Sequence, residues 1–133
     1  MTHSRWIFAL AAALLVGAAC SDAPTGGATR AGTVIVRLTT PHADDGAVLF
    51  EVSGQPIDGA TAANASLRLF TRRTGASTLV GVLVGDVAGG AVVTLQVPDV
   101  GAAAGYAARV VEVADRQNAL RTSLTGYALT VAP

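Results

Sequence analysis

The amino-acid sequence predicts an all-β protein, an antiparallel two-sheet sandwich of roughly seven to nine short strands. Apolar and polar residues alternate in several short runs, which is the period of a β-strand. Clusters of Gly, Pro, Asp and Asn separate these runs, and no strong amphipathic helix is evident in the body of the chain. Many short strands of this kind favour two packed sheets, and a barrel with the same strands is the alternative.

Residues 33–39 and 47–53 form the first two predicted strands. Pro41 ends the first strand, and Asp44-Asp45-Gly46 supplies a turn before the second. The residues expected to face inward in these two runs are Val34, Val36, Leu38, Val48, Phe50 and Val52.

The middle of the chain predicts a loop followed by two strands. Residues 54–64 contain Gly, Pro and Asp-Gly and predict a loop, with a short turn of helix at 60–64. Residues 66–72 alternate around Leu67 and Leu69, and residues 73–76 resemble a turn. The fully apolar run 79–84 suits a central strand.

The clearest alternation lies at residues 91–97, where Val93, Leu95 and Val97 are expected to face inward. A hairpin loop is predicted before this run and a connection after it. The segments assigned in this part of the chain are the hairpin loop 86–90, the connection 98–105 and the strands 106–113, 119–123 and 127–131.

Aromatic side chains are few, so the core is expected to consist mainly of small and β-branched groups. The bulky core candidates are Phe50, Phe70, Tyr106 and Tyr127.

The beginning of the chain has the pattern of an export signal. A short polar segment with a positive charge at Arg5 leads into the apolar run 6–16. A membrane-spanning helix needs about 20 apolar residues, so this run favours a signal peptide over a permanent span.

Small residues after this run lead to Cys20, the only cysteine of the chain. The segment resembles the lipobox of bacterial lipoproteins, in which an aliphatic residue and two small residues precede the cysteine. Gly17 stands in the aliphatic position here, with Val16 one residue earlier. The resemblance implies cleavage before Cys20 and lipid on its sulfur, which also accounts for an unpaired cysteine in an exported protein. The alternative is cleavage by the ordinary signal peptidase, which leaves a free thiol.

The resemblance also predicts how the chain is divided and where it resides. Residues 1–19 are the lipoprotein signal peptide, residues 20–31 the lipidated cysteine with a flexible linker, and residues 32–133 the β-sandwich domain. In Gram-negative lipoproteins, aspartate directly after the cysteine favours the inner membrane. Ser21 occupies that position, so we expect a lipid-anchored protein of the cell envelope, with the outer membrane favoured over the inner.

The predicted body also resembles bacterial cohesin-like and immunoglobulin-like modules in the order of its strands. The quoted runs are Val-Ile-Val-Arg-Leu, Gly-Ala-Val-Leu-Phe-Glu-Val, Val-Ala-Gly-Gly-Ala-Val-Val-Thr-Leu-Gln-Val and Tyr-Ala-Leu-Thr-Val. The disulfide and core tryptophan of immunoglobulin domains are missing, because Trp6 and Cys20 both precede the body.

Composition and motifs argue against several kinds of function. Eight basic and nine acidic side chains remain after residues 1–19 are removed, so no basic surface for nucleic acid is expected. No nucleophile elbow, His-Glu-x-x-His pair, phosphate loop or cysteine metal motif occurs, and His42 is expected to be a solvated loop histidine. We therefore expect no cofactor, no metal and no enzymatic activity.

Some charged residues leave alternatives open. The predicted loops contain Asp44, Asp45, Asp58, Asp86, Asp99 and Asp115, for which turn formation is favoured over calcium binding. Arg72-Arg73 predicts a solvated strand end rather than a contact with an acidic partner, and Glu51 and Glu112 are expected to face outward rather than to form a catalytic pair.

The sequence thus predicts a non-catalytic envelope lipoprotein that presents a sandwich to a protein or polysaccharide partner, through loop tips or sheet edges. One alternative is a small hydrolytic or carbohydrate-active enzyme that uses loop carboxylates. Another is a structural spacer or assembly subunit whose strands pair with neighbours.

Overall fold

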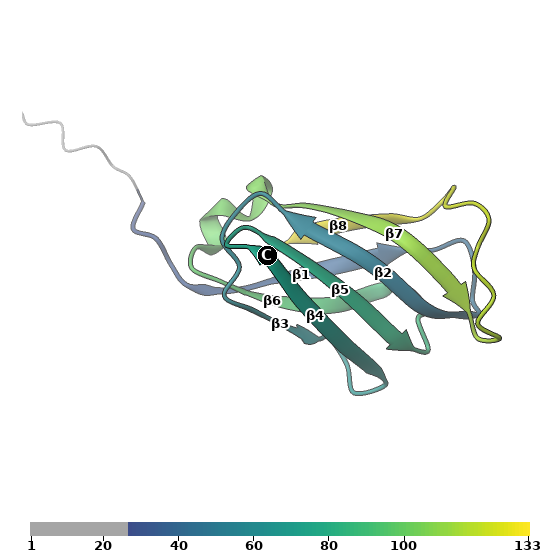
Figure 1. Ribbon diagram of the computed structural model, residues 1–133. Helices are drawn as coiled ribbons and strands as arrows, with labels where there is room; N and C mark the ends of the chain where they lie inside the picture. Colours follow the sequence, from purple (N-terminus) through teal and green to yellow (C-terminus); the bar gives the residue numbers. More distant parts are fainter. Residues whose placement is uncertain (1–26) are drawn as a thin grey trace, which may run out of the picture.

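The computed structural model describes residues 27–133, which form two antiparallel four-stranded sheets and one short 3₁₀ helix (Figure 1). The elements are β1 (Gly32–Thr39), β2 (Asp45–Ser53), β3 (Gly59–Ala62), β4 (Leu67–Gly75), β5 (Thr78–Gly85), β6 (Gly90–Val97), η1 (Val100–Gly105), β7 (Ala107–Asp115) and β8 (Ala128–Ala132).

The chain passes repeatedly from one sheet to the other, and only β4 and β5 are consecutive strands of the same sheet. One sheet has the order β3-β6-β1-β8 and the other the order β4-β5-β2-β7. β1 lies inside its sheet, where Val34 is opposite Leu95 of β6 and Val36 is opposite Val131 of β8. The two sheets are separate layers and do not close into a barrel, so the predicted all-β sandwich is confirmed.

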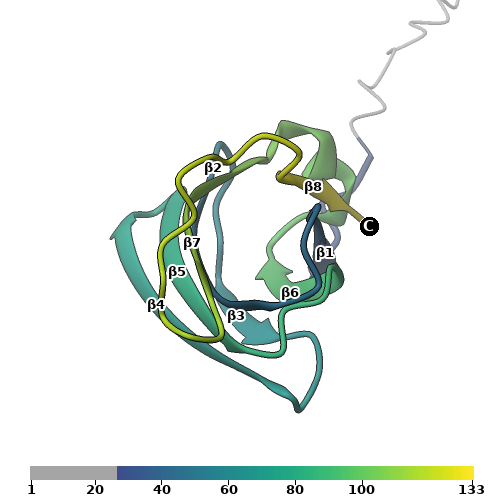
Figure 2. The ribbon, with the colours of Figure 1, turned by 90° about the vertical axis from the view of Figure 1, so that its right-hand side faces the viewer.

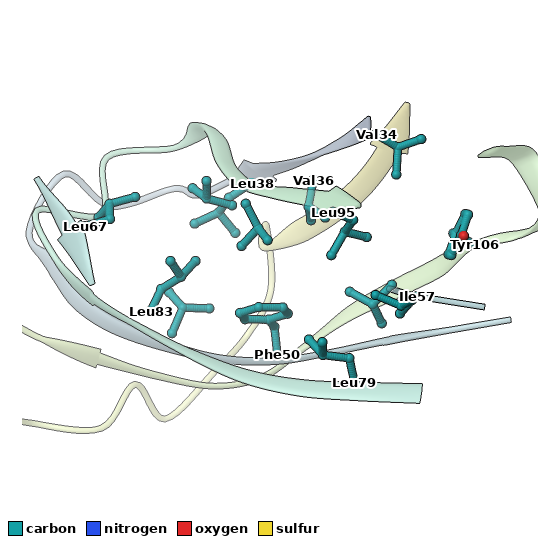
Figure 3. Packing of buried hydrophobic residues seen from close by; sticks show 14 of the residues in the cluster. Val34, Val36, Leu38, Phe50, Ile57, Leu67, Leu79, Leu83, Leu95 and Tyr106 are labelled. Carbon is teal, nitrogen blue, oxygen red and sulfur yellow. The ribbon is translucent and has the colours of Figure 1, made fainter. Parts of the chain in front are cut away.

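The two sheets lie face to face (Figure 2), and the buried apolar residues form one cluster between them. The residues predicted to face inward in β1, β2 and β6 are all buried. Figure 3 shows Phe50 between Leu79, Leu83 and Leu95, at the centre of this cluster. Period-two alternation therefore identified the inner face of both sheets correctly.

Gly81 makes room for the largest core ring. It lies opposite Phe50 in the β2–β5 pair, and a Cβ added at Gly81 would come within 2.4 Å of the ring carbon Cζ of Phe50. A side chain at this position of β5 would therefore collide with the ring, which accounts for a glycine in the interior of a central strand.

The helical turn predicted at 60–64 is wrong. Residues 59–62 form strand β3, which pairs with β6. Ala60 and Ala62 pack against the core, and their backbone groups bond to β6. Pairing with β6 and burial of these small side chains outweigh the local preference of alanine for helix.

The strand predicted at 119–123 is also wrong, because this segment pairs with β7 only through a bridge between Ala114 and Leu120. The segment instead belongs to the long loop 116–127, in which Arg121 turns toward the carboxylates of Asp44 and Asp45.

Two turns differ from their predictions. Residues 86–90 do not close a hairpin, because β5 and β6 belong to different sheets; the segment crosses between the layers and buries Val87. The turn predicted at 73–76 lies at Ala76 and Ser77, because β4 continues to Gly75.

Phe70 is not a core residue. Phe50 and Tyr106 are buried and Tyr127 packs partly against the core, whereas Phe70 is 61% exposed. Leu67 and Leu69 face inward on β4, so Phe70 must point to the outer side of its sheet.

Cys20 and the predicted signal peptide lie outside the described residues. Within residues 27–133, no helix has the length and apolar character needed to cross a bilayer.

Candidate functional site

Asp45 is the one buried charged residue among the described part of the chain, and its side chain is completely inaccessible. It begins β2, at the end of the sandwich where the loop 40–44 meets the long loop 116–127. The sequence predicts a turn at Asp45, whereas in the structure this residue begins β2 and is buried.

Three side chains neutralise and hydrogen-bond the carboxylate of Asp45. Arg121 donates to Oδ1 from Nε at 3.1 Å and from Nη2 at 2.9 Å. The Tyr127 hydroxyl is 2.9 Å from both oxygens, and the Thr40 hydroxyl donates to Oδ2 at 2.6 Å. We call these four residues, Asp45, Arg121, Tyr127 and Thr40, the Asp45 cluster. Because a buried charge is costly without partners, the cluster holds the two loops together.

The hydrogen bonds of the cluster shift the pKa values of Arg121, Tyr127 and Asp44. The hydrogen bond to Asp45 raises the pKa of Arg121 above its already high value. Burial and then the bond to Asp45 raise the pKa of Tyr127, so its hydroxyl stays protonated and donates. Arg121 also donates to Asp44 at 2.5 Å, which lowers the pKa of that carboxyl.

His42 lies beside this cluster, with its ring 5.9 Å from the ring of Tyr127, and it is exposed as predicted. The carboxylate oxygens of Asp45 accept bonds from protein groups on both sides. The arrangement is therefore suited to closing one end of the sandwich, and it offers a substrate no free carboxylate oxygen.

The six aspartates divide between the two ends of the sandwich. Asp44, Asp45, Asp86 and Asp115 belong to the end with the long loop, and Asp58 and Asp99 to the end with η1. Several of them support turns: Asp99 Oδ1 accepts from Gly101 N at 2.9 Å, and Asp115 Oδ1 accepts from Gln117 N at 2.9 Å. Among residues 27–133, no three acidic, histidine or cysteine side chains are grouped so as to hold a metal ion.

The second feature is the outer face of the β4-β5-β2-β7 sheet. The pairing registers place Phe70, Val82, Leu49 and Glu112 in one row across the four strands. No other strand or helix of the described chain covers this row (Figure 2). Val84, which is 40% exposed, lies in the next row with Ala47.

A shallow hollow of about 220 Å³ indents this face on the β7 side. Leu120, which is 65% exposed, forms its outer wall, and Glu112 contributes a carboxylate. The complete lining consists of Ala47, Leu49, Val82, Glu112, Val113, Ala114 and Leu120. We call the exposed row and this hollow together the outer face.

Charged residues surround the outer face. Glu51 and Glu112 lie on this side, as predicted, and Glu51 forms an ion pair with Arg109 at 3.1 Å. Arg72 is exposed on the same side, as is Arg68, and neither they nor Glu112 form an ion pair within residues 27–133. Arg73 instead donates to the carbonyl oxygen of Asp58.

An uncovered apolar sheet face with an exposed aromatic residue marks a site of interaction more often than a catalytic site. Sequence alternation contained this signal, because Phe70 stands between Arg68 and Arg72 in the same alternating run. Models of protein families, curated proteins and solved structures were compared with this chain, and none of the three comparisons found a match.

Proposed function

We propose that this chain is a non-catalytic lipoprotein of the bacterial envelope, anchored through Cys20, whose sandwich binds a protein partner through the outer face. The observation on which the binding role rests is the uncovered row from Phe70 to Leu49 beside the apolar hollow. The pattern resemblance to cohesin-like and immunoglobulin-like modules agrees with a binding role.

The chemistry of the outer face favours protein over polysaccharide. Its hollow is lined by aliphatic side chains and a single carboxylate, Glu112. Sugar hydroxyls buried against such a lining would lose hydrogen bonds to water without replacing them. Apolar side chains of a protein lose nothing comparable, and their burial is favourable.

A non-catalytic role is supported by the state of the carboxylates. Asp44 and Asp45 accept bonds from Arg121, Asp86 pairs with Arg116, and Glu51 pairs with Arg109. Acid–base catalysis requires a carboxyl group with access to substrate, and these four groups are already bound to arginines. Glu112, which forms no ion pair among residues 27–133, has no second carboxyl group beside it in the lining of the hollow.

Anchoring is supported by the lipobox resemblance around Cys20 and by the Gly-, Ala- and Thr-rich linker behind it. Ser21 after the cysteine favours the outer membrane within the same resemblance. The linker of about twelve residues would keep the sandwich within about 40 Å of the bilayer.

The anchor is tested by metabolic labelling with a fatty-acid analogue in a Gram-negative host. Wild-type protein should incorporate the label and enter the detergent phase, and Cys20→Ala should do neither, because no other residue supplies a thiol. An unlabelled, water-soluble wild-type protein would contradict the anchor.

The binding role is tested by photo-cross-linking in intact cells. A photoreactive phenylalanine analogue replaces Phe70 in one variant and Thr33, exposed on β1 of the other sheet, in a matched control. We expect protein adducts from position 70 and few from position 33. Equal labelling at both positions, or none at 70, would refute a binding role for the outer face.

A further inference from the structure

We propose that the partner of the outer face is a second copy of this chain, packed face to face about a two-fold axis parallel to the strands. The inference deepens the proposed function, since it names the partner for the same surface. It depends on complementary features at the two edges of the sheet, the β4 edge and the β7 edge.

The first element of this complementarity is shape. Phe70 projects from the edge strand β4, whereas the hollow lies at the opposite edge beside β7. Val82, the neighbour of Phe70 on β5, lines the near side of the hollow. Three strand spacings of about 4.8 Å separate the β4 and β7 edges, so Phe70 cannot reach Glu112 and Leu120 on the far side of the hollow in its own chain. An axis that runs between β5 and β2 places β4 of each copy over β7 of the other, and each Phe70 then meets the partner's hollow.

The second element is charge. On β4, Arg68 and Arg72 flank Phe70 on the outer side, and both lack an ion-pair partner within the described chain. At the β7 edge, the carboxylate of Glu112 lies in the lining of the hollow. A Phe70 that enters the partner's hollow therefore brings two guanidinium groups toward an unpaired carboxylate. The same register places Arg72 over Arg109 of the other copy, whose charge is compensated by its ion pair with Glu51. The two-fold axis repeats this contact, as an isologous interface requires.

The rival two-fold axis, perpendicular to the strands, is disfavoured by the same charges. It would place β4 over β4, with the arginines of the two copies facing one another. Like charges across an interface cost free energy, and β4 has no carboxylate to compensate them, so the edges of the sheet favour the parallel axis.

The position of the linker agrees with the parallel axis. Residues 27–31 leave the sandwich at the end with η1, where Val100 N donates to the Arg30 carbonyl at 2.8 Å (Figure 1). A two-fold axis parallel to the strands keeps this end of both copies on the same side. Two lipid anchors would then reach one membrane, whereas the perpendicular axis would direct them to opposite sides.

The test uses the full-length chain in cells, with pairs of introduced cysteines. Arg68 and Ala114 lie at opposite ends of one row of the sheet, so the parallel axis brings Arg68 of one copy over Ala114 of the other. The variant Arg68→Cys/Ala114→Cys retains Phe70. It is treated with a bifunctional thiol reagent. The two edges of one sheet are about 14 Å apart, and the spacer of the reagent is shorter than this distance, so that it cannot join the two cysteines of one chain.

We expect a band of two chain masses for this variant. The matched control Arg68→Cys/Thr33→Cys, with its second cysteine on the other sheet, should lack that band, as should wild type with Cys20 alone. Adding Phe70→Glu should abolish the band, with an unchanged melting temperature of the purified variant as the check on folding. In the same cross-linking variant, Glu112→Arg should weaken the band. Adding Arg72→Glu to that chain should recover part of it.

Other outcomes overturn the inference in recognisable ways. A ladder of higher masses would indicate open, head-to-tail contacts, and a strong dimer band from Phe70→Cys alone would indicate the perpendicular axis. Photo-adducts at position 70 to a different protein, without the two-chain band, would reject the second copy and leave the proposed function standing. An absence of adducts at position 70 would reject the proposed function itself.

Discussion

Asp45 and Arg121 lie 76 residues apart in the sequence, yet the guanidinium Nη2 is 2.9 Å from the carboxylate Oδ1. Asp45 is inaccessible to solvent, and the Arg121 side chain is only 17% exposed. The pair joins the beginning of β2 to the loop between β7 and β8, so it closes one end of the sandwich.

Replacing Arg121 with Met should destabilise the fold by about 3–5 kcal/mol, because it leaves a buried carboxylate without its counter-charge. Urea denaturation would measure the loss. The matched control is Arg109→Met, which breaks the exposed pair with Glu51 and should cost less than about 1 kcal/mol. Equal losses for the two variants would show that Asp45 is solvated in solution.

A second prediction concerns the pH dependence of Tyr127. Its pKa is raised above the ordinary value of 10.0, chiefly by burial and then by the bond to Asp45. The stabilisation that this protonated hydroxyl contributes is therefore fully present below about pH 10. It is lost as the pH rises through the pKa of Tyr127 in the folded protein.

Tyr127→Phe should cost about 1–3 kcal/mol near neutral pH, because Asp45 loses a donor. Measured from about pH 8 upward, the difference between wild type and this variant should stay constant to about pH 10 and then shrink, since only wild type has this hydroxyl to ionise. Denaturation curves across that range would test it, and a constant difference would argue against the raised pKa. Tyr106, whose pKa burial also raises, is present in both proteins and does not affect the comparison.

The pairing of Gly81 with Phe50 gives a third prediction. Gly81→Ala should destabilise the protein by about 1–3 kcal/mol, because the added methyl group collides with the Phe50 ring. The double variant Gly81→Ala/Phe50→Leu should lose less than the sum of the two single variants. Gly75→Ala is the control, since a Cβ there meets nothing within 4 Å, and its effect should be small. Additive losses would mean that Phe50 has another rotamer available.

Much of the fold could be predicted because alternation depends on the sequence of each strand alone. Val34, Phe50 and Leu95 are buried as their two-residue period required. Strand β3 could not be predicted in this way, because Gly59–Ala62 has small residues and is a strand only through its pairing with β6. The same limit applies to the segment around Leu120. Its apolar and polar residues alternate as in a strand, but it pairs with β7 only through one bridge.

The candidate sites were less accessible to sequence reasoning. Asp44 and Asp45 have the same residue type in adjacent positions, yet one is exposed and the other inaccessible. The difference depends on Arg121 and Tyr127, which approach from a distant loop. Phe70 was assigned to the core from its size, although its place between Arg68 and Arg72 already indicated the outer side.

The position of β1 has a consequence for the order in which the chain folds. β1 begins the described sandwich, but its two neighbours, β6 and β8, come much later in the sequence. During synthesis β1 therefore has both of its partners only after residues 128–132 have been added. Such pairing between distant segments folds slowly, and until it is complete the Val34–Leu38 strand has unsatisfied backbone groups.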